Sequence, residues 1–226
     1  MSGFAYAIHV RPGNFCDVFS TIHEFPNESA RHAPCTPGCK MALVKAADPR
    51  VSFAELQQWP DDGRRYELYD GEAIVVPAPI PRHQRVGINV ERLLTEYELA
   101  TGGLMLHAPI DIVLTEYDVV QPDVVFFRAE RRHLVDMSEA TRVPPDLAVE
   151  VLSRSTERRD RGRKMELLAR SGVPEYWIAD PSRHVLEVYA LKERHYALTG
   201  AYREHQHVSS PTLNGLTFDV HRIFEE

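Results

Sequence analysis

The sequence predicts one domain of the α/β or α+β class, in which helices flank a mixed β-sheet. Two observations support this prediction. Segments with the periodicity of helices alternate with segments typical of strands from residue 51 onward. A chain of 226 residues with 43% hydrophobic content can also bury a sizeable core, and its length is close to that of one domain.

The first 40 residues differ from the rest, because they show neither helical nor strand periodicity. They scatter Pro, Gly, Asn and Ser, so we interpret residues 1–40 as an irregular N-terminal extension. The folded domain is expected to span residues 41–226, with Met41 as an alternative natural start of translation. Three side chains in the extension suggest a zinc knuckle: His32, Cys35 and Cys39. A second well-spaced pair of ligands is missing, which favours incidental thiols.

The overall charge limits the partners that the whole surface can bind. With 33 acidic and 26 basic side chains the formal net charge is -7, so contact with nucleic acid requires a local basic patch. Three cysteines are too few for a disulfide scaffold. No window approaches the ~20 apolar residues that span a bilayer, and the start is a poor signal peptide. We therefore expect a cytoplasmic protein without a membrane partner, and its oligomeric state is open between a monomer and a homodimer.

The first elements of the domain have clear local signals. Ser52-Phe-Ala-Glu55 is a capping box and predicts a short helix through Gln58, which Pro60 ends. Asp70-Gly71 separates two strand-like runs, and this pair adopts the positive φ angles of a two-residue turn. The sequence therefore predicts a β-hairpin, formed by residues 65–69 and 72–76.

Helices and strands then alternate. Apolar residues form one helical stripe between His83 and Thr101, and a second, charged helix is predicted from about Arg158 to Ser171. Strands are predicted at five apolar runs: Ile110–Leu114, Val119–Phe127, Leu147–Leu152, Glu175–Ala179 and Val185–Leu191. The aromatic residues of the fourth run are expected in the core rather than on a base-stacking surface. The remaining C-terminal stretch is polar and less regular.

Two of these apolar runs contain a carboxylate, which is costly to bury without a partner. Glu150 has two apolar residues on each side, so it requires a counter-charge or a cation. Asp123 follows Pro122 at the start of an equally apolar run, where a turn role is also open. Asp146 follows two prolines, and we interpret it as an ordinary turn residue.

A shared divalent cation would remove the burial cost of both carboxylates. Neighbouring strands lie about 4.8 Å apart, so Asp123 and Glu150 can meet at one ion if their strands are adjacent. Their separation of 27 residues allows a connection that returns the chain to a neighbouring strand. Mg²⁺ suits such a site, because it keeps several waters and takes its other ligands from carbonyl and phosphate oxygens; Mn²⁺ is the second metal we consider.

A basic segment follows Glu150 directly. Between Arg154 and Arg170 there are seven basic and three acidic side chains, a local balance of 7 − 3 = +4. A hydroxyl residue can cap the following helix, whose N-terminal amides attract phosphate. Asp160 and Lys164 lie four residues apart, so an exposed ion pair is an ordinary alternative to a catalytic role for the lysine.

Four motifs stand in order along the chain: Pro122-Asp123, Glu150-Val-Leu-Ser153, Asp160-Arg-Gly-Arg-Lys164 and Gly172-Val-Pro-Glu-Tyr-Trp-Ile-Ala-Asp-Pro181. Together they resemble the Uma-two family of restriction-endonuclease-like proteins, a branch of the PD-(D/E)XK nuclease superfamily. The likeness also includes Arg65-Tyr-Glu-Leu-Tyr-Asp-Gly71 and His83. It runs from about Val51 to Val220.

The resemblance implies a restriction-endonuclease-like fold and Mg²⁺-dependent hydrolysis of phosphodiester bonds, with Asp123 and Glu150 holding the metal. One position departs from the superfamily pattern, whose lysine stands two residues after the glutamate, where this chain has Leu152. Lys164 on the following helix is the expected substitute. Its neighbour Arg163 is expected to point elsewhere and to serve DNA affinity.

His83 and Glu67 match family positions near the active site, where a second acid or a proton donor can act. Each residue has an ordinary alternative. His83 could cap its helix, and Glu67 could face solvent on its strand.

These observations predict a Mg²⁺-dependent endonuclease that acts on DNA. The first alternative is a catalytically inactive nucleic-acid-binding or regulatory protein on the same fold, which the displaced lysine would explain. The second is an interaction module without a nucleic-acid partner, which the acidic balance would suit. Steep salt dependence of binding would indicate phosphate contacts and separate these two.

Overall fold

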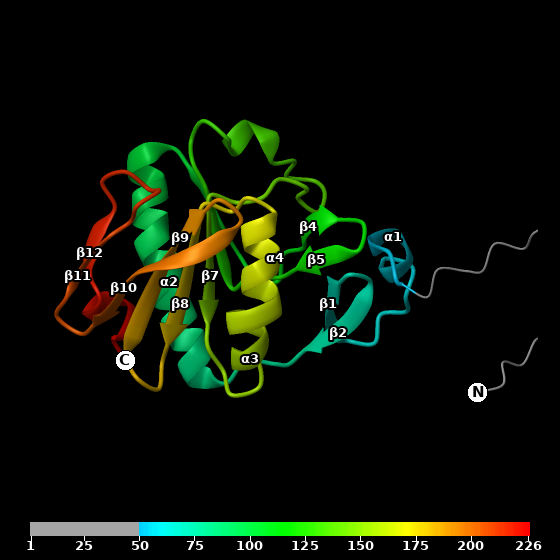
Figure 1. The fold of residues 1–226 in the computed structure, drawn as a ribbon, viewed down its shortest axis with the longest axis horizontal. Coiled ribbons are helices and arrows are strands. Elements are labelled where there is room, and N and C mark those ends of the chain that lie inside the picture. Colours follow the sequence, from blue (N-terminus) through cyan, green and yellow to red (C-terminus); the bar gives the residue numbers. More distant parts are fainter. Residues whose placement is uncertain (1–49) are drawn as a thin grey trace, which may run out of the picture. The chain divides into compact units, whose positions relative to one another are not determined.

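A computed structural model of the chain describes residues 50–226 (Figure 1). The extension predicted at residues 1–40, the domain boundary at residue 41 and the candidate zinc ligands lie outside these described residues. In the described part, none of the helices combines the length and the apolar character needed to cross a membrane.

The central sheet has six strands in the order β10-β9-β8-β7-β6-β3. β7 and β8 pair in parallel and the other neighbours pair antiparallel, so the sheet is mixed, as the sequence predicts. Its strands are β3 (Leu104–His107), β6 (Val124–Phe127), β7 (Leu147–Val151), β8 (Glu175–Asp180), β9 (Val185–Lys192) and β10 (His195–Arg203).

A smaller antiparallel sheet has the order β2-β1-β5-β4. Its strands are β1 (Arg65–Tyr69), β2 (Glu72–Val76), β4 (Ile112–Thr115) and β5 (Asp118–Val120). The predicted hairpin is confirmed, and its turn residues Asp70 and Gly71 have φ angles of 50° and 79°. A separate pair of short strands lies near the C-terminus: β11 (His207–Ser209) and β12 (Thr217–Asp219).

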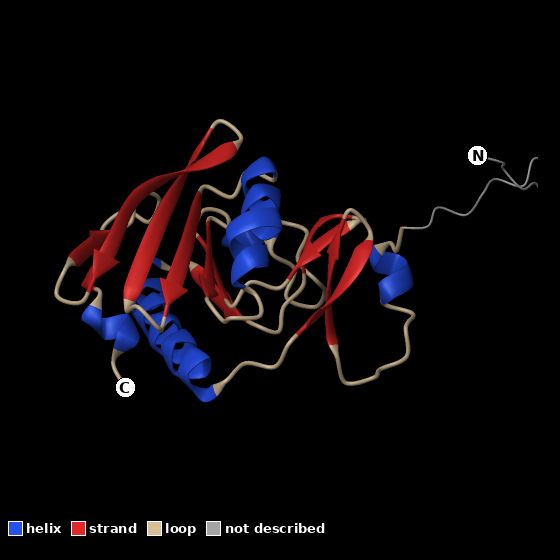
Figure 2. Ribbon diagram, turned by 60° about the horizontal axis from the view of Figure 1, so that its bottom comes forward, coloured by secondary structure: helices blue, strands red, loops and turns tan. Residues whose placement is uncertain are grey.

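Helical elements cover both faces of the central sheet (Figures 1 and 2). The helical elements of the described residues are α1 (Phe53–Leu56), α2 (Pro81–Thr101), η1 (Arg132–Leu134), α3 (Glu157–Arg159), η2 (Asp160–Lys164), α4 (Met165–Arg170) and α5 (His221–Phe224). Of these, α1 packs on the small sheet. On one face α2 and α5 pack against Val149 of β7. On the other face α4 and the small sheet pack against Ala148. Because successive strand residues point to opposite faces, Glu150 shares the α4 face with Ala148.

The charged segment predicted as one helix forms three consecutive helical elements, α3, η2 and α4. The middle element, η2, is a turn of π-helix over Asp160–Lys164, and it buries both of its end residues. Turns of π-helix are rare in proteins overall, but many of those that occur lie at functional sites. The segment passes over the same sheet face to which Glu150 points.

The predicted strand Val119–Phe127 is wrong as a single element. It divides into β5 in the small sheet and β6 in the central sheet, with Gln121–Asp123 between them. Pro122 has no N–H group for a ladder, and the Gln121 amide donates instead to Glu67 Oε1 over 2.8 Å. This break carries the chain from one sheet to the other and leaves Asp123 at the start of β6.

The prediction of irregular structure after Leu191 is also wrong, because β10, β11, β12 and α5 follow. All nine residues of β10 are at least partly exposed, since the strand lies at the edge of the sheet, and no apolar run marks it. Tyr176 and Trp177 are fully buried. This confirms their predicted place in the core.

Candidate active site

Asp123 and Glu150 lie at the same end of two neighbouring strands. β6 and β7 pair antiparallel with Val124 opposite Val149, and the same register continued by one residue places Asp123 opposite Glu150. The amide of Val151 donates to Asp123 Oδ2 over 2.7 Å and fixes that carboxylate against β7. The structure thus brings together the two carboxylates that the sequence predicts as a pair.

Lys164 is the partner that the buried Glu150 requires. Its Nζ lies 2.7 Å from Glu150 Oε1 and 2.8 Å from Glu67 Oε1. Lys164 is 1% exposed and Glu150 4%, so these contacts form an interior ion cluster and not a surface salt bridge. Leu152, at the position where the superfamily places its lysine, packs in the core.

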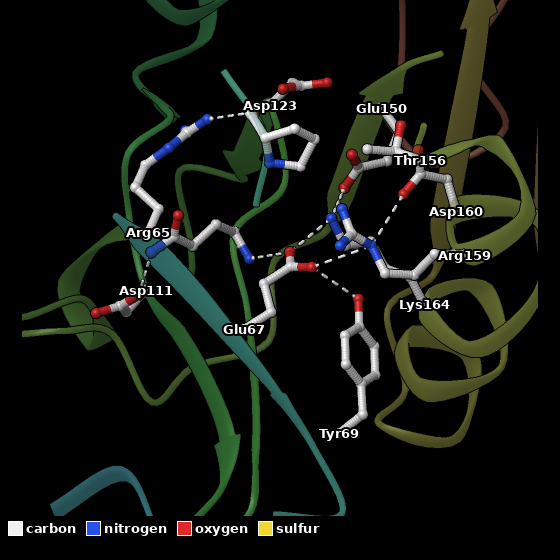
Figure 3. Close-up of polar contacts among 12 residues, drawn as sticks. Arg65, Glu67, Tyr69, Asp111, Asp123, Glu150, Thr156, Arg159, Asp160 and Lys164 are labelled. Atoms are coloured by element: carbon white, nitrogen blue, oxygen red, sulfur yellow. Dashed lines mark hydrogen bonds and ion pairs between the residues drawn. The ribbon is translucent and has the colours of Figure 1, made fainter. Parts of the chain in front are cut away.

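Glu67 joins the small sheet to the ion cluster (Figure 3). It is fully buried on β1, and its carboxylate accepts hydrogen bonds from the Gln121 amide at 2.8 Å and from the Tyr69 hydroxyl at 2.9 Å. Burial alone would raise the pKa of Glu67, but Lys164 and Arg159 outweigh burial and lower it. Glu67 therefore stays ionised, and the alternative of a solvent-facing strand residue is wrong.

His83 lies in the first turns of α2 and contacts the other side of the carboxylate pair. Its Nε2 is 3.2 Å from Asp123 Oδ2. Burial acts to lower the pKa of His83, but the hydrogen bond and charge of Asp123 outweigh it and raise that pKa. The residue at the helix N-cap is Ile80, so the alternative of a capping histidine is wrong.

Asp160 and Arg159 complete the cluster beside Lys164. Asp160 is 1% exposed, so the alternative of an exposed Asp160–Lys164 pair is wrong. Burial raises the pKa of Asp160, with Lys164 opposing that rise. Arg159 Nε lies 3.3 Å from Glu67 Oε2 and 3.8 Å from Asp160 Oδ1. The sequence gives no reason to choose Arg159 from seven basic residues in its segment, because its partner Glu67 lies on a distant strand.

One further prediction needs correction. Asp146 is fully buried rather than a simple turn residue, and its carboxylate binds the Arg128 backbone amide and the guanidinium groups of Arg128 and Arg131. Arg163 contacts other groups than Lys164 does. It donates to Glu72 at 2.6 Å and to the Tyr69 carbonyl, which holds the β1–β2 hairpin, and its role in DNA affinity stays a prediction.

The site has an excess of negative charge. In formal charges, with His83 neutral, four carboxylates (Glu67, Asp123, Glu150 and Asp160) face two cations (Lys164 and Arg159), which gives 2 − 4 = −2. Burial raises the pKa of Glu150 well above its usual range; Lys164 opposes this, and the neighbouring carboxylates add to it. For Lys164, burial would lower the pKa, but Glu150 and Glu67 outweigh burial and raise it.

The ion cluster opens into a cleft of about 390 Å³. Its lining includes Arg65, the segment after β2 and the part of α2 near His83. The floor holds the predicted catalytic residues Asp123, Glu150 and Lys164. The cleft therefore gives a solvent-borne ligand access to an otherwise buried set of charges.

A divalent cation fits this site on two counts. The oxygen donors of Asp123 and Glu150 suit Mg²⁺ or Mn²⁺, and the excess negative charge would be reduced by a cation. Within residues 50–226 no three His, Cys, Asp or Glu side chains converge as a complete ligand set. Water, backbone carbonyl or substrate oxygens would have to supply the remaining ligands.

The arrangement of mixed sheet, flanking helices and paired carboxylates with a buried lysine places the chain among proteins with a restriction-endonuclease-like fold. The model of the Uma2 family, described as "Putative restriction endonuclease", matches residues 53–221. The chain belongs to this family.

Solved structures match this chain, and one of them shares its fold over most of both chains. It is a protein of Anabaena variabilis ATCC 29413 described as "a putative nuclease belonging to DUF820", with a TM-score of 0.65. The two chains are 16% identical, and the match covers 77% of this chain and 97% of the other. At that identity the likeness shows the fold alone. A comparison with curated proteins finds no match.

Proposed function

We propose that the chain is a divalent-metal-dependent endonuclease that hydrolyses phosphodiester bonds in DNA, with Mg²⁺ as the metal and Mn²⁺ as a substitute. The observation that carries this proposal is the register of β6 and β7, which sets Asp123 opposite Glu150 at the floor of an open cleft. Membership of the Uma2 family supports the reaction class.

Asp123 and Glu150 would hold the metal. When bound, a divalent ion polarises a phosphoryl oxygen and lowers the pKa of a bound water. His83 holds Asp123 in place through its Nε2 contact of 3.2 Å. The ion pair with Lys164 orients Glu150 in the same way.

Lys164 supplies a fixed positive charge beside the reacting phosphate. Its contacts with Glu150 and Glu67 hold Nζ at the floor of the cleft, so no reorganisation is needed when negative charge develops on the phosphate. Glu67 acts on the lysine from the buried side. We assign Glu67 the role of positioning Lys164, because Lys164 and Arg159 keep its carboxylate ionised and the Gln121 amide and the Tyr69 hydroxyl hold it in place.

Three basic side chains line the cleft: Arg65, Arg159 and Lys164. Arg159 and Lys164 are already paired with carboxylates of the ion cluster. Arg65 and a bound divalent ion would therefore supply most of the attraction for phosphate. Binding should therefore weaken steeply as salt is added.

The test is cleavage of supercoiled, linear and single-stranded DNA by the purified full chain with Mg²⁺ or Mn²⁺. Wild type should nick or cut at least one substrate, and Asp123→Ala should not. Glu91→Gln is the matched control, because Glu91 lines the same cleft outside the ion cluster, and it should cut at the wild-type rate. Salt-sensitive DNA binding without cleavage under any of these conditions would instead favour the inactive nucleic-acid-binding alternative.

A further inference from the structure

A second pocket, of about 230 Å³, lies next to the cleft. We call it the Trp59 pocket, because it is formed mainly by residues 53–66 around Trp59, with Asp111 and Gln121. Arg65 and Gln121 line both the Trp59 pocket and the cleft. A ligand that lies along the cleft can therefore extend one of its groups into the Trp59 pocket.

Trp59 offers an aromatic surface in this pocket. It is 41% exposed, whereas Trp177 is fully buried. The Trp59 and Tyr66 rings meet edge to face, with centroids 5.2 Å apart and planes at 82°. The Tyr66 hydroxyl donates to Asp62 over 2.7 Å, which holds Tyr66 in position. The edge-to-face contact leaves indole surface available for stacking by a planar ligand.

The polar groups of the Trp59 pocket suit a neutral ligand that carries hydrogen-bond donors. Asp61, Asp62 and Asp111 outnumber Arg64 and Arg65 among its lining residues, so a phosphate is disfavoured there. Gln121 donates through its amide nitrogen to Asp111 at 2.8 Å. Its amide oxygen is buried and has no hydrogen-bond partner in the part of the chain that the structure describes. An unpaired buried acceptor is costly, so Gln121 has an unmet hydrogen bond in the lining of the Trp59 pocket.

We propose that the Trp59 pocket binds one unpaired nucleobase, stacked on Trp59, while the adjoining phosphate lies in the cleft beside Arg65. This inference rests on the nuclease function proposed above. A base inside a duplex has both faces covered by its neighbours, so it cannot stack on Trp59 without leaving the helix. The substrate therefore carries an unpaired nucleotide next to the bond that is cleaved.

The two tryptophans make the inference directly measurable. In the full chain, only Trp59 is exposed among the tryptophans, so stacking of a base should quench its fluorescence. The probes are a 12-nucleotide oligo(dC), an abasic strand of the same length and a matched duplex. Each probe is titrated into the protein twice, once in a buffer with EDTA and once in a buffer with Ca²⁺. Binding of each labelled probe is followed in parallel by anisotropy. Oligo(dC) should quench the emission of wild type, while the abasic strand and the duplex should leave it unchanged.

Two variants distinguish the fluorescence signal of Trp59 from the stacking contact that Trp59 makes with the base. Trp59→Phe removes the reporter and should abolish the quenching. Trp59→Leu removes the stacking surface and should weaken oligo(dC) binding about fivefold or more, with binding of the abasic strand unchanged. Leu198→Ala is the matched control, because Leu198 is an exposed apolar residue that lines neither the cleft nor the Trp59 pocket. It should keep both the quenching and the affinity of wild type.

The possible failures are distinguishable. If oligo(dC) binds by anisotropy but Trp59 emission does not change, or if Trp59→Leu binds as tightly as wild type, the base pocket is refuted and the nuclease proposal stands. If the abasic strand quenches as strongly as oligo(dC), the signal comes from phosphate and the base pocket is refuted too. If no probe binds in either buffer, both proposals fail together.

Discussion

Replacement of Lys164 by methionine tests the ion cluster at its centre. Methionine keeps much of the volume of lysine and removes the charge, so Glu150 and Glu67 lose the cation that lies 2.7 and 2.8 Å away. Both carboxylates stay buried. The variant therefore leaves uncompensated charge in the interior, although Arg159 still contacts Glu67.

The size of the effect follows from this burial. Removing one partner of a buried ion pair costs about 3–5 kcal/mol, which for a domain of this size lowers Tm by about 6–20 °C. A double variant, Lys164→Met with Glu67→Gln, should recover part of the loss, because one of the two uncompensated carboxylates is gone. Added Mg²⁺ should stabilise the single variant more than wild type, since a cation can then compensate Glu150.

Thermal unfolding with EDTA and with Mg²⁺, followed by circular dichroism, measures all three proteins. The double variant also separates folding from chemistry: it should fold but cleave DNA about 100-fold more slowly than Glu67→Gln alone. If Lys164→Met melts within about 1 °C of wild type, far less than a lost buried pair allows, the ion cluster does not exist as described. If the double variant cleaves as fast as Glu67→Gln, Lys164 has no role in the reaction.

Three other variants test neighbouring contacts. His83→Ala should weaken divalent metal binding about 10- to 100-fold in calorimetry with little change in Tm, because the histidine only orients Asp123. An unchanged metal affinity would exclude that role. Asp146→Ala should destabilise the fold by about 3 kcal/mol in chemical denaturation, since two arginines lose a buried partner; a change below about 0.5 kcal/mol would contradict the assignment. For Arg161→Ala the expectation concerns pH. Burial would raise the pKa of Glu187, but Arg161 and Tyr189 outweigh burial and lower it. The stability that this pair contributes is therefore present above the unfolded-state pKa of Glu187 and is lost as the pH falls through its folded-state pKa. Arg161→Ala should lose less Tm than wild type between about pH 6 and 3, and equal losses in the two proteins would contradict this expectation.

Local signals in the sequence predict much of the fold. The capping box at Ser52, the turn at Asp70-Gly71 and the helical stripe from His83 to Thr101 all depend on neighbouring residues, and each corresponds to an element of the structure. The strand Val119–Phe127 fails for the opposite reason. Its two halves belong to different sheets, and only Pro122 in the sequence marks the break. The edge strand β10 has no apolar run, because neither of its faces is fully covered.

The same contrast between local signals and contacts of distant residues applies to the candidate site. Glu150 attracts attention because a carboxylate inside an apolar run needs a partner, and that reasoning leads to Asp123 on the neighbouring strand. The contact of Glu67 with Lys164 and Arg159 joins residues more than 90 positions apart, and no local pattern reports it. The prediction for Asp146 is wrong for a related reason. The prolines before it suggest a turn, while its arginine partners lie on a preceding segment that packs against it.

The central claim is that Asp123 and Glu150 hold one divalent ion at the floor of the cleft. Isothermal titration calorimetry with Mn²⁺, without DNA, tests it on wild type, Asp123→Asn and the cleft control Glu91→Gln. Asparagine can still accept the hydrogen bond from the Val151 amide, so the fold should be kept. We predict one site in wild type, the same affinity in Glu91→Gln and affinity at least about 10-fold weaker in Asp123→Asn. The same isotherm for all three proteins would contradict the account.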